Sequence, residues 1–322
     1  MIGVALSTRD LVKRYGRRLA LDGFTLAVPQ GAVMGLVGQN GAGKTTWMMA
    51  VAGFLRPTSG TIDVLGGGPF DATIHTGRFA ILPQDSELPL EGTPETLLYR
   101  YARLQGLSAA AARASVDEVL AEMNLSDRAA STIRSLSHGM RKRVMLAQCF
   151  LGSPEVVLLD EPLNGLDPME QNRMRRFILA RRGRQTIVVS SHNLNDVEIL
   201  CSHVAFVEKG KVARFATLRE LTAEAGRVEY HLARVPADHT PLEAALAAAF
   251  PSGRFTWRMV DPDETALVCT YEAGEEALGI AEINHRLLPV LLGQVDVLSV
   301  ASGLSLEQAY MTEVNTTRPH RC

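Results

Sequence analysis

Eight consecutive residues near the N-terminus, Gly38 to Thr45, have the pattern of a phosphate-binding loop. They read Gly-Gln-Asn-Gly-Ala-Gly-Lys-Thr and fit G-x-x-x-x-G-K-[ST], between an apolar run at 32–37 and a helical run at 45–52. Backbone N–H groups of such a P-loop turn inward around phosphate oxygens, and the helix N-terminus adds positive charge. We expect Lys44 to reach the β- and γ-phosphates and the Thr45 hydroxyl to bind Mg²⁺. The alternative, a glycine-rich turn with a chance lysine, does not explain the flanking strand and helix.

Two carboxylates, Asp160 and Glu161, follow a second apolar run at 156–159. Open α/β sheets bind ligands at the carboxyl ends of their strands. Asp160 could hold Mg²⁺ there, directly or through water, and Glu161 could polarise the attacking water as a general base. Alternatively, both are ordinary carboxylates satisfied by caps or lysines, and the pair alone does not decide between these interpretations.

A histidine follows a third apolar run in the same way. Residues 186–190 read as a buried strand, and His192 comes just after its end, where it could contact a γ-phosphate. A lone histidine is more often structural than catalytic. Its interpretation therefore depends on the residues that surround it.

Several segments resemble the ABC ATPase family, and the decisive one is residues 136–140. This segment, Leu-Ser-His-Gly-Met, resembles the family signature, usually written LSGGQ, and lies upstream of the Asp160 strand at the usual spacing. Gln84 resembles the Q-loop residue, residues 164–167 (Asn-Gly-Leu-Asp) resemble the D-loop, and Tyr15 resembles the aromatic residue that stacks on adenine. The resemblance runs from about residue 4 to residue 221.

The resemblance implies an α/β fold of the P-loop NTPase class, with a RecA-like parallel sheet core and a helical insertion. It implies ATP and Mg²⁺ as cofactors and ATP hydrolysis as the reaction. The catalytic residues would be Glu161, His192 and Gln84, and the metal residues Thr45, Gln84 and Asp160. The nucleotide-binding residues would be Tyr15, Gly38, Asn40, Gly41, Gly43, Lys44, Thr45, Thr46, Ser137 and Gly139.

The signature segment also implies a dimer. Ser137 starts a helix whose free N–H groups can face an anion, and in the family Ser137 and Gly139 would bind the γ-phosphate held by the partner's Lys44. Two copies, or this chain and a homologous ATPase subunit, would then enclose two ATP molecules. His138 and Met140 replace the usual glycine and glutamine, but forms of this kind resemble one branch of exporters. The alternative for Ser137 is a plain helix cap.

The order of apolar runs predicts two domains, residues 1–221 and 222–322. The first has buried parallel strands, with a helical insertion at about 85–151. Its predicted helices cover 96–105, 108–122 and 139–151. The second has the order β-α-β-β-α-β of a small ferredoxin-like α+β unit. Its predicted strands are 228–235, 254–260, 265–271 and 295–300, and its predicted helices are 242–250, 275–292 and a last one at 305–314.

The composition of the chain indicates which kinds of partner molecule to expect. The chain has 322 residues, is 46% hydrophobic and has a net charge of −2, so it lacks the basic excess of nucleic-acid proteins, and we expect no nucleic acid. Its four cysteines are scattered, which argues against a metal cluster or a disulfide framework. The sequence contains no apolar run of about 18 residues. We therefore expect separate integral membrane permease subunits to form the transport path, with this chain peripheral on the cytoplasmic side of the bacterial inner membrane.

Two other functions are compatible with the sequence. A soluble ABC-type ATPase acting in translation or DNA maintenance is the main alternative, but it usually carries two cassettes in tandem or long coiled coils. A nucleotide-sensing subunit that does not hydrolyse ATP is another, and Glu161 and His192 argue against it. Residues 305–310 (Ser-Leu-Glu-Gln-Ala-Tyr) resemble the ending of ATPases paired with separate permeases. The cargo is not readable, and export follows from the family branch alone.

Overall fold

The structure, a computed structural model, describes residues 3–223, 227–233, 240–249, 254–259, 267–272 and 280–302. The chain divides into two compact units, residues 1–217 and 218–322. Each unit has a hydrophobic core of its own, so each is described by itself.

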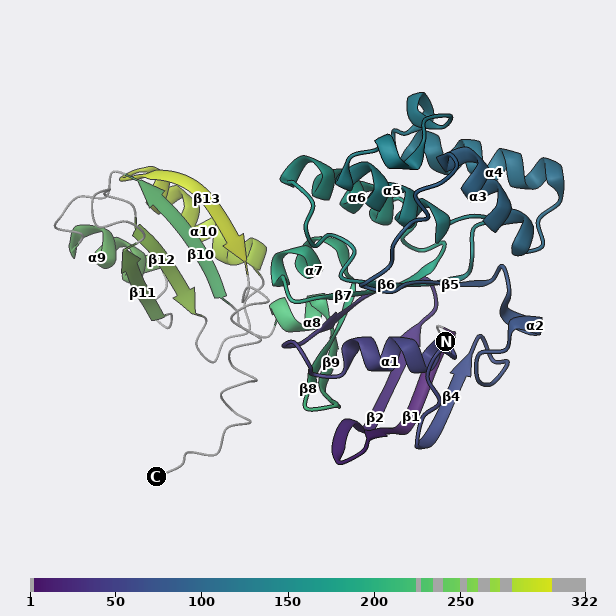
Figure 1. The fold of residues 1–322 in the computed structure, drawn as a ribbon. Coiled ribbons are helices and arrows are strands. Elements are labelled where there is room, and N and C mark those ends of the chain that lie inside the picture. The colour runs from purple at the N-terminus through teal and green to yellow at the C-terminus, as the bar shows by residue number, and fades with distance from the viewer. Residues whose placement is uncertain are drawn as a thin grey trace. The chain divides into compact units, whose positions relative to one another are not determined.

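A six-stranded sheet forms the centre of the first unit (Figure 1). Its order is β5-β6-β7-β3-β8-β9, and its neighbouring strands run parallel except β8 and β9. The strands are β3 (Val33–Val37), β5 (Phe79–Leu82), β6 (Val156–Asp160), β7 (Thr186–Ser191), β8 (His203–Glu208) and β9 (Lys211–Thr217). Every residue of β3, β6 and β7 is buried, as expected of parallel strands covered on both faces. The strands predicted from the three apolar runs are confirmed.

A three-stranded antiparallel sheet adds a second layer that the sequence analysis did not predict. It consists of β1 (Val4–Tyr15), β2 (Arg18–Pro29) and β4 (Ser59–Val64), in the order β2-β1-β4. Buried and exposed residues alternate along much of β2, because one face of such a sheet packs on the core while the other faces water. Helix α1 (Lys44–Val51) packs against strands of both sheets.

Three helices fill the segment between β5 and β6 and lie together on one side of the unit (Figure 1). They are α3 (Pro94–Leu104), α4 (Ala109–Glu122) and α5 (His138–Gln148), and the predicted helices are thereby confirmed, although the last ends earlier than expected. Thr93 and Ser108 cap α3 and α4 with their hydroxyl groups. The remaining elements are α2 (Ala72–His75), α6 (Pro168–Leu179), α7 (Leu194–Leu200) and the 3₁₀ turns Ser126–Arg128 and Ile133–Ser135.

The second unit contains a four-stranded antiparallel sheet of order β11-β12-β10-β13. Its elements are α8 (Leu218–Ala223), β10 (Arg227–Ala233), α9 (Thr240–Ala249), β11 (Arg254–Met259), β12 (Leu267–Glu272), α10 (Ile280–Leu292) and β13 (Asp296–Ser302). From β10 onward the element order is the predicted β-α-β-β-α-β of a ferredoxin-like unit. Buried Leu246 and Leu287 join one core with Tyr230, whose hydroxyl donates to Asn284 Oδ1 at 2.8 Å. The helix predicted at 305–314 lies outside the described residues.

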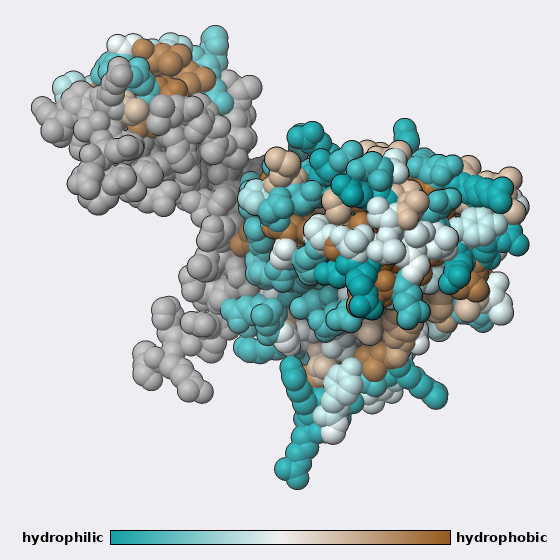
Figure 2. Space-filling view, turned by 45° about the horizontal axis from the view of Figure 1, so that its top comes forward, coloured by the Kyte–Doolittle hydropathy of each residue, from teal (hydrophilic) through white to brown (hydrophobic). Residues whose placement is uncertain are grey.

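The surface of the first unit is mostly polar on the face that Figure 2 shows, where apolar residues gather only in small groups. Its most exposed large apolar side chains include Phe54 in the loop after α1, Leu104 of α3 and Met169 of α6. Throughout the part of the chain that the structure describes, each helix is too short or too polar to cross a membrane.

Candidate functional site

Helix α1 fixes the position of the P-loop because it is anchored at its buried face. Trp47 is fully buried, stacks on Phe24 of β2 with ring centroids 5.7 Å apart, and donates its indole N–H to Thr8 Oγ1 at 3.1 Å. Stacked aromatic rings and a buried indole hydrogen bond both favour one orientation. The N-terminus of α1, with its unpaired N–H groups, therefore stays aimed at the loop that precedes it.

Two glycines of the loop are required by space and conformation. A Cβ atom at Gly38 would clash with the backbone carbonyl of Val207. Gly43, at the start of α1, has φ +116°, and a Cβ there would lie 2.8 Å from the carbonyl oxygen of Ala20. An L side chain is strained at such a φ, so the backbone can make this close turn only with glycine.

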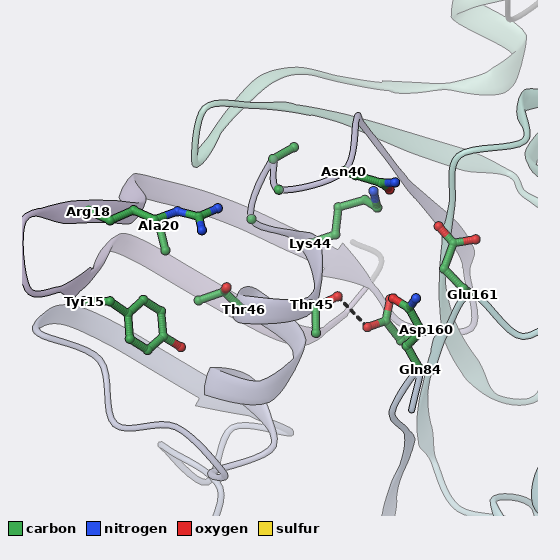
Figure 3. Close-up of a pocket in the computed structure, with 13 residues that line it drawn as sticks. Tyr15, Arg18, Ala20, Asn40, Lys44, Thr45, Thr46, Gln84, Asp160 and Glu161 are labelled. Carbon is green, nitrogen blue, oxygen red and sulfur yellow. Dashed lines mark hydrogen bonds between the residues drawn. The ribbon is translucent and has the colours of Figure 1, made fainter. Parts of the chain in front are cut away.

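A cavity of about 280 Å³ lies along this loop (Figure 3). We call it the P-loop cavity. It is lined by Tyr15, Arg18, Ala20, Asn40, Gly41, Ala42, Gly43, Lys44, Thr45, Thr46, Gln84, Asp160 and Glu161. These residues come from β1, β2, the loop and α1, the segment after β5, and the end of β6. Ten residues that the sequence analysis predicted for the site thus line a single cavity.

The Thr45 hydroxyl donates to Asp160 Oδ2 at 2.6 Å, as Figure 3 shows. The other oxygen, Oδ1, accepts a hydrogen bond from Ser190, the residue paired with Asp160 in the β6–β7 register. Both oxygens of Asp160 thus accept hydrogen bonds from hydroxyl groups, which fixes the orientation of the carboxylate beside Thr45. Hydroxyl and carboxylate oxygens are the ligands that Mg²⁺ prefers, and these two fit that ion.

Glu161 is held at both its backbone and its side chain. Its backbone has φ +51°, which is uncommon for a residue with a Cβ and typical of functional sites. Its N–H donates to Ser190 Oγ at 3.0 Å, and its two carboxylate oxygens each lie 3.0 Å from His192 Nδ1. The carboxylate is therefore oriented by His192, which lines a small neighbouring cavity together with Glu161.

Lys44 is buried and turns back onto its own loop. Its Nζ donates to the carbonyl oxygen of Gly38 at 2.6 Å and to that of Gln39 at 3.3 Å. Burial lowers the pKa of Lys44, and the negative charges of Glu161 and Asp160 partly oppose this change. The ammonium group thus lies close to both carboxylates, at the end of the cavity where Thr45 also lies.

A buried polar chain connects the helix after His192 to the D-loop-like segment. Asp196 of α7 accepts hydrogen bonds from Arg175 of α6, and Arg175 also donates to Gln171 Oε1 at 3.3 Å. The Gln171 amide donates in turn to the carbonyl oxygens of Leu163 and Leu166, at 3.4 and 3.2 Å. Residues 164–167 are therefore tied to the segment that carries His192.

The signature-like segment lies beside the D-loop-like segment and does not line the P-loop cavity. Ser137 is exposed and caps α5, where its Oγ accepts the N–H of Met140 at 3.2 Å. Lys142 of α5 donates to the carbonyl oxygen of Asn164, and the His138 ring lies 4.0 Å from the Cβ position of Gly165. Neither Ser137 nor Gly139 lines the P-loop cavity.

The structure therefore separates the predicted site residues into two groups. One cavity is lined by Lys44, Thr45, Gln84, Asp160 and Glu161, and His192 contacts the Glu161 carboxylate. Ser137 and Gly139 lie elsewhere on the unit.

Three lining residues were not predicted as site residues: Ala42, which belongs to the P-loop motif itself, and Arg18 and Ala20, which lie outside every motif. The signal was available for Arg18, because Gly16 next to Tyr15 marks a tight turn that brings Arg18 opposite the tyrosine.

The loop before α1, the Thr45–Asp160 pair and the Glu161–His192 pair at one sheet edge define a P-loop nucleotide hydrolase. The sequence profile of the ABC transporter family matches residues 21–164. Nod factor export ATP-binding protein I of Burkholderia orbicola (strain AU 1054) is 36% identical over 222 residues, which cover 68% of this chain and 73% of that protein. Daunorubicin resistance ATP-binding protein DrrA3 of Streptomyces coeruleorubidus is 36% identical over 228 residues, covering 70% and 72%.

Two further matches extend the comparison. A solved ATP-binding subunit of an ABC transporter has a TM-score of 0.61 at 29% identity, covering 67% of this chain and 91% of that one. Nod factor export ATP-binding protein I of Ralstonia nicotianae (strain ATCC BAA-1114 / GMI1000) is 31% identical over 298 residues, 90% of this chain and 92% of that protein. The chain belongs to the ABC transporter family, and it is an ATP-binding and ATP-hydrolysing subunit. The fold and the function expected from the sequence are confirmed.

Proposed function

We propose that this chain is the ATPase subunit of an exporter, in which two copies bind head to tail around two ATP-Mg²⁺ and drive separate membrane permease chains. The observation that carries the dimer is the separation of the two groups of site residues. Ser137 and Gly139 do not line the P-loop cavity of their own chain, although Ser137 starts a helix suited to an anion. A second copy could supply them, as closed symmetric dimers do when each chain completes the other's site.

The proposed Mg²⁺ site consists of Thr45, Asp160 and Gln84 together with phosphate oxygens. Mg²⁺ in such sites keeps several waters and uses one or two carboxylates plus substrate phosphates. Within the described residues, no group of three or more His, Cys, Asp or Glu side chains lies together as a metal site. The protein donors alone are therefore few, and metal binding should depend on bound nucleotide.

The proposed catalytic base is Glu161. Its carboxylate lies at the edge of the P-loop cavity and is oriented by His192 at 3.0 Å. A base held in this way can accept a proton from a water that attacks the γ-phosphorus, while Lys44 stabilises the phosphate charge. His192 would keep Glu161 in place and contact the γ-phosphate.

Export and location are proposed from the relatives. Two of them are described by name as an export protein and a resistance protein, and both carry the words ATP-binding protein. We place the chain on the cytoplasmic face of the membrane, attached through its permease, with helices α3–α5 and Gln84 as the route that transmits the movement. The cargo is left unassigned.

The unit of residues 218–322 is proposed to stabilise the dimer or to regulate it. It has a core of its own, and the match to the Ralstonia nicotianae protein covers 90% of this chain. Removing the chain after Leu221 should weaken dimerisation or change the rate of ATP turnover. If both quantities stay unchanged, this role is wrong.

The test of the proposed function is association driven by ATP. Glu161→Gln should bind ATP without turning it over, so sedimentation velocity should show a dimer with ATP and a monomer without it. The full chain should also co-purify with a permease from solubilised membranes, and reconstitution with that permease should change its turnover rate. A variant that binds ATP yet stays monomeric would contradict the head-to-tail dimer.

A further inference from the structure

Arg18 is a cation of the P-loop cavity with no assigned partner. Its guanidinium group makes no hydrogen bond or ion pair with any residue that the structure describes, although it lines the cavity. Arginine presents several donors in a planar fork that matches phosphate oxygens. An exposed, unpaired arginine at the wall of an anion site is therefore available to the anion.

The position of Arg18 is set by two neighbours. It stands opposite Tyr15 in the β1–β2 pairing, across a two-residue turn. Its Nη2 lies 3.3 Å from the place that a Cβ would take at Gly41, so the absence of a side chain at Gly41 leaves room for the guanidinium. Figure 3 shows the side chain pointing from β2 toward the P-loop. The group thus spans the space between Tyr15 and the loop.

The formal charges of the lining residues show what Arg18 contributes to the cavity. Among the described lining residues, Arg18 and Lys44 are cationic and Asp160 and Glu161 are anionic, so the formal charges cancel. Without Arg18 the lining would carry a net negative charge, which would oppose a polyanionic nucleotide. Lys44 already lies near both carboxylates, so Arg18 is the cation farther from them.

We propose that Arg18 binds the α-phosphate of the nucleotide and sets affinity for nucleoside phosphates as a class. Thr45, Asp160 and Lys44 gather at one end of the cavity and Tyr15 lies toward the other. A group between them meets the part of the nucleotide that joins the base to the β-phosphate. This inference rests on ATP binding with its base toward Tyr15 and its terminal phosphates toward Lys44.

The test measures dissociation constants of the full chain for ATP, ADP, AMP and adenosine, by competition with a fluorescent ADP analogue in EDTA. Arg18→Gln should weaken ATP, ADP and AMP by a common factor of about ten, because it removes charge-assisted hydrogen bonds at a solvent-exposed site. Adenosine should bind as tightly as to the wild type. The salt dependence of ATP binding should fall, and Arg18→Lys should restore part of the affinity.

Arg17→Gln is the matched control, because Arg17 is the neighbouring exposed arginine and does not line the cavity. It should leave all four constants unchanged. An effect of Arg18→Gln on ATP alone would place Arg18 at the γ-phosphate, and an equal effect on adenosine would show a role at the base. Either result, or no change at all, would overturn the proposal.

Lys44→Ala separates this inference from the assignment of the cavity itself. If Lys44→Ala does not weaken ATP binding, the cavity is not the nucleotide site and both assignments fail. If Lys44→Ala weakens binding and Arg18→Gln does not, the cavity assignment stands and only the role of Arg18 is wrong.

Discussion

The P-loop cavity and the signature-like segment differ in how far the chain alone completes them. Around the cavity, polar groups bond to one another within the chain: Thr45 to Asp160, Asp160 to Ser190, and Glu161 to His192. At the signature-like segment, Ser137 is exposed and caps only its own helix. The P-loop cavity is ordered by hydrogen bonds within the chain. The exposed side of Ser137 has no such partner among the described residues. This difference is what a site shared between two chains requires.

The variant with the largest expected effect tests the P-loop cavity. Glu161→Gln should lower ATP turnover by about 10²–10⁴-fold, the usual contribution of a general base, while the dissociation constant for ATP stays near the wild-type value. The measurement is phosphate release at saturating ATP. Glu155→Gln is the control, since the one ion pair of Glu155 with a described residue is the exposed pair with Arg78. Wild-type turnover in Glu161→Gln would remove the carboxylate from the mechanism.

The next prediction tests the hydrogen-bonded chain Asp196–Arg175–Gln171, which connects the segment after β7 to the D-loop-like segment. Arg175→Met would leave the buried Asp196 carboxyl group, only 6% exposed, without its ion-pair partner, and should lower the free energy of unfolding by about 3 kcal/mol. Arg78→Met breaks an exposed pair, at 44% and 46% exposure, and should cost under about 1 kcal/mol. Urea titrations of both variants measure the difference. Equal losses would show that the Asp196–Arg175–Gln171 chain does not hold the D-loop-like segment.

A smaller and sharper test uses two serines with the same local geometry. Ser137 and Ser108 both cap a helix, and each Oγ accepts a backbone N–H three residues later at 3.2 Å. Replacing either by alanine should cost about 1 kcal/mol of stability. In a Glu161→Gln background, only Ser137→Ala should also weaken the ATP-driven dimer, measured by sedimentation. Equal behaviour of the two variants would reduce Ser137 to a plain cap.

The smallest expected effect concerns the two buried cysteines of the first unit. Burial raises the pKa of the Cys149 thiol to about 12, and burial also raises that of Cys201. Because the thiolate is the reactive form, both should stay unlabelled by iodoacetamide at pH 8 in the folded protein, and label fully in urea. Mass spectrometry of each cysteine peptide checks this. Labelling of Cys149 in the native state would indicate local opening of α5.

Much of the first unit could be predicted because its signals are local. Short apolar runs bounded by turn signals favour strands buried on both faces, as at β3, β6 and β7. The glycines of residues 38–45 indicate a phosphate-binding loop from the local sequence alone. The antiparallel β1–β2–β4 sheet was missed, since strands that alternate buried and exposed residues have a weaker pattern. Arg18 was missed with that sheet, because it reaches the cavity through its pairing with Tyr15 across the turn at Gly16, and that turn is recognised only once the two strands are.

The sequence by itself determined which chemical groups this protein has: the P-loop glycines, Lys44 and Thr45, the carboxylates at the end of β6, and His192 after β7. Only the tertiary structure decided which of them meet. Strand β7 lies between β3 and β6, and therefore Ser190 can bond Asp160 while His192 reaches Glu161. The same fold places Ser137 and Gly139 outside the P-loop cavity. The motifs that carry these groups are local in the sequence. The distances between the groups depend on strand order, which is set by the packing of the whole core.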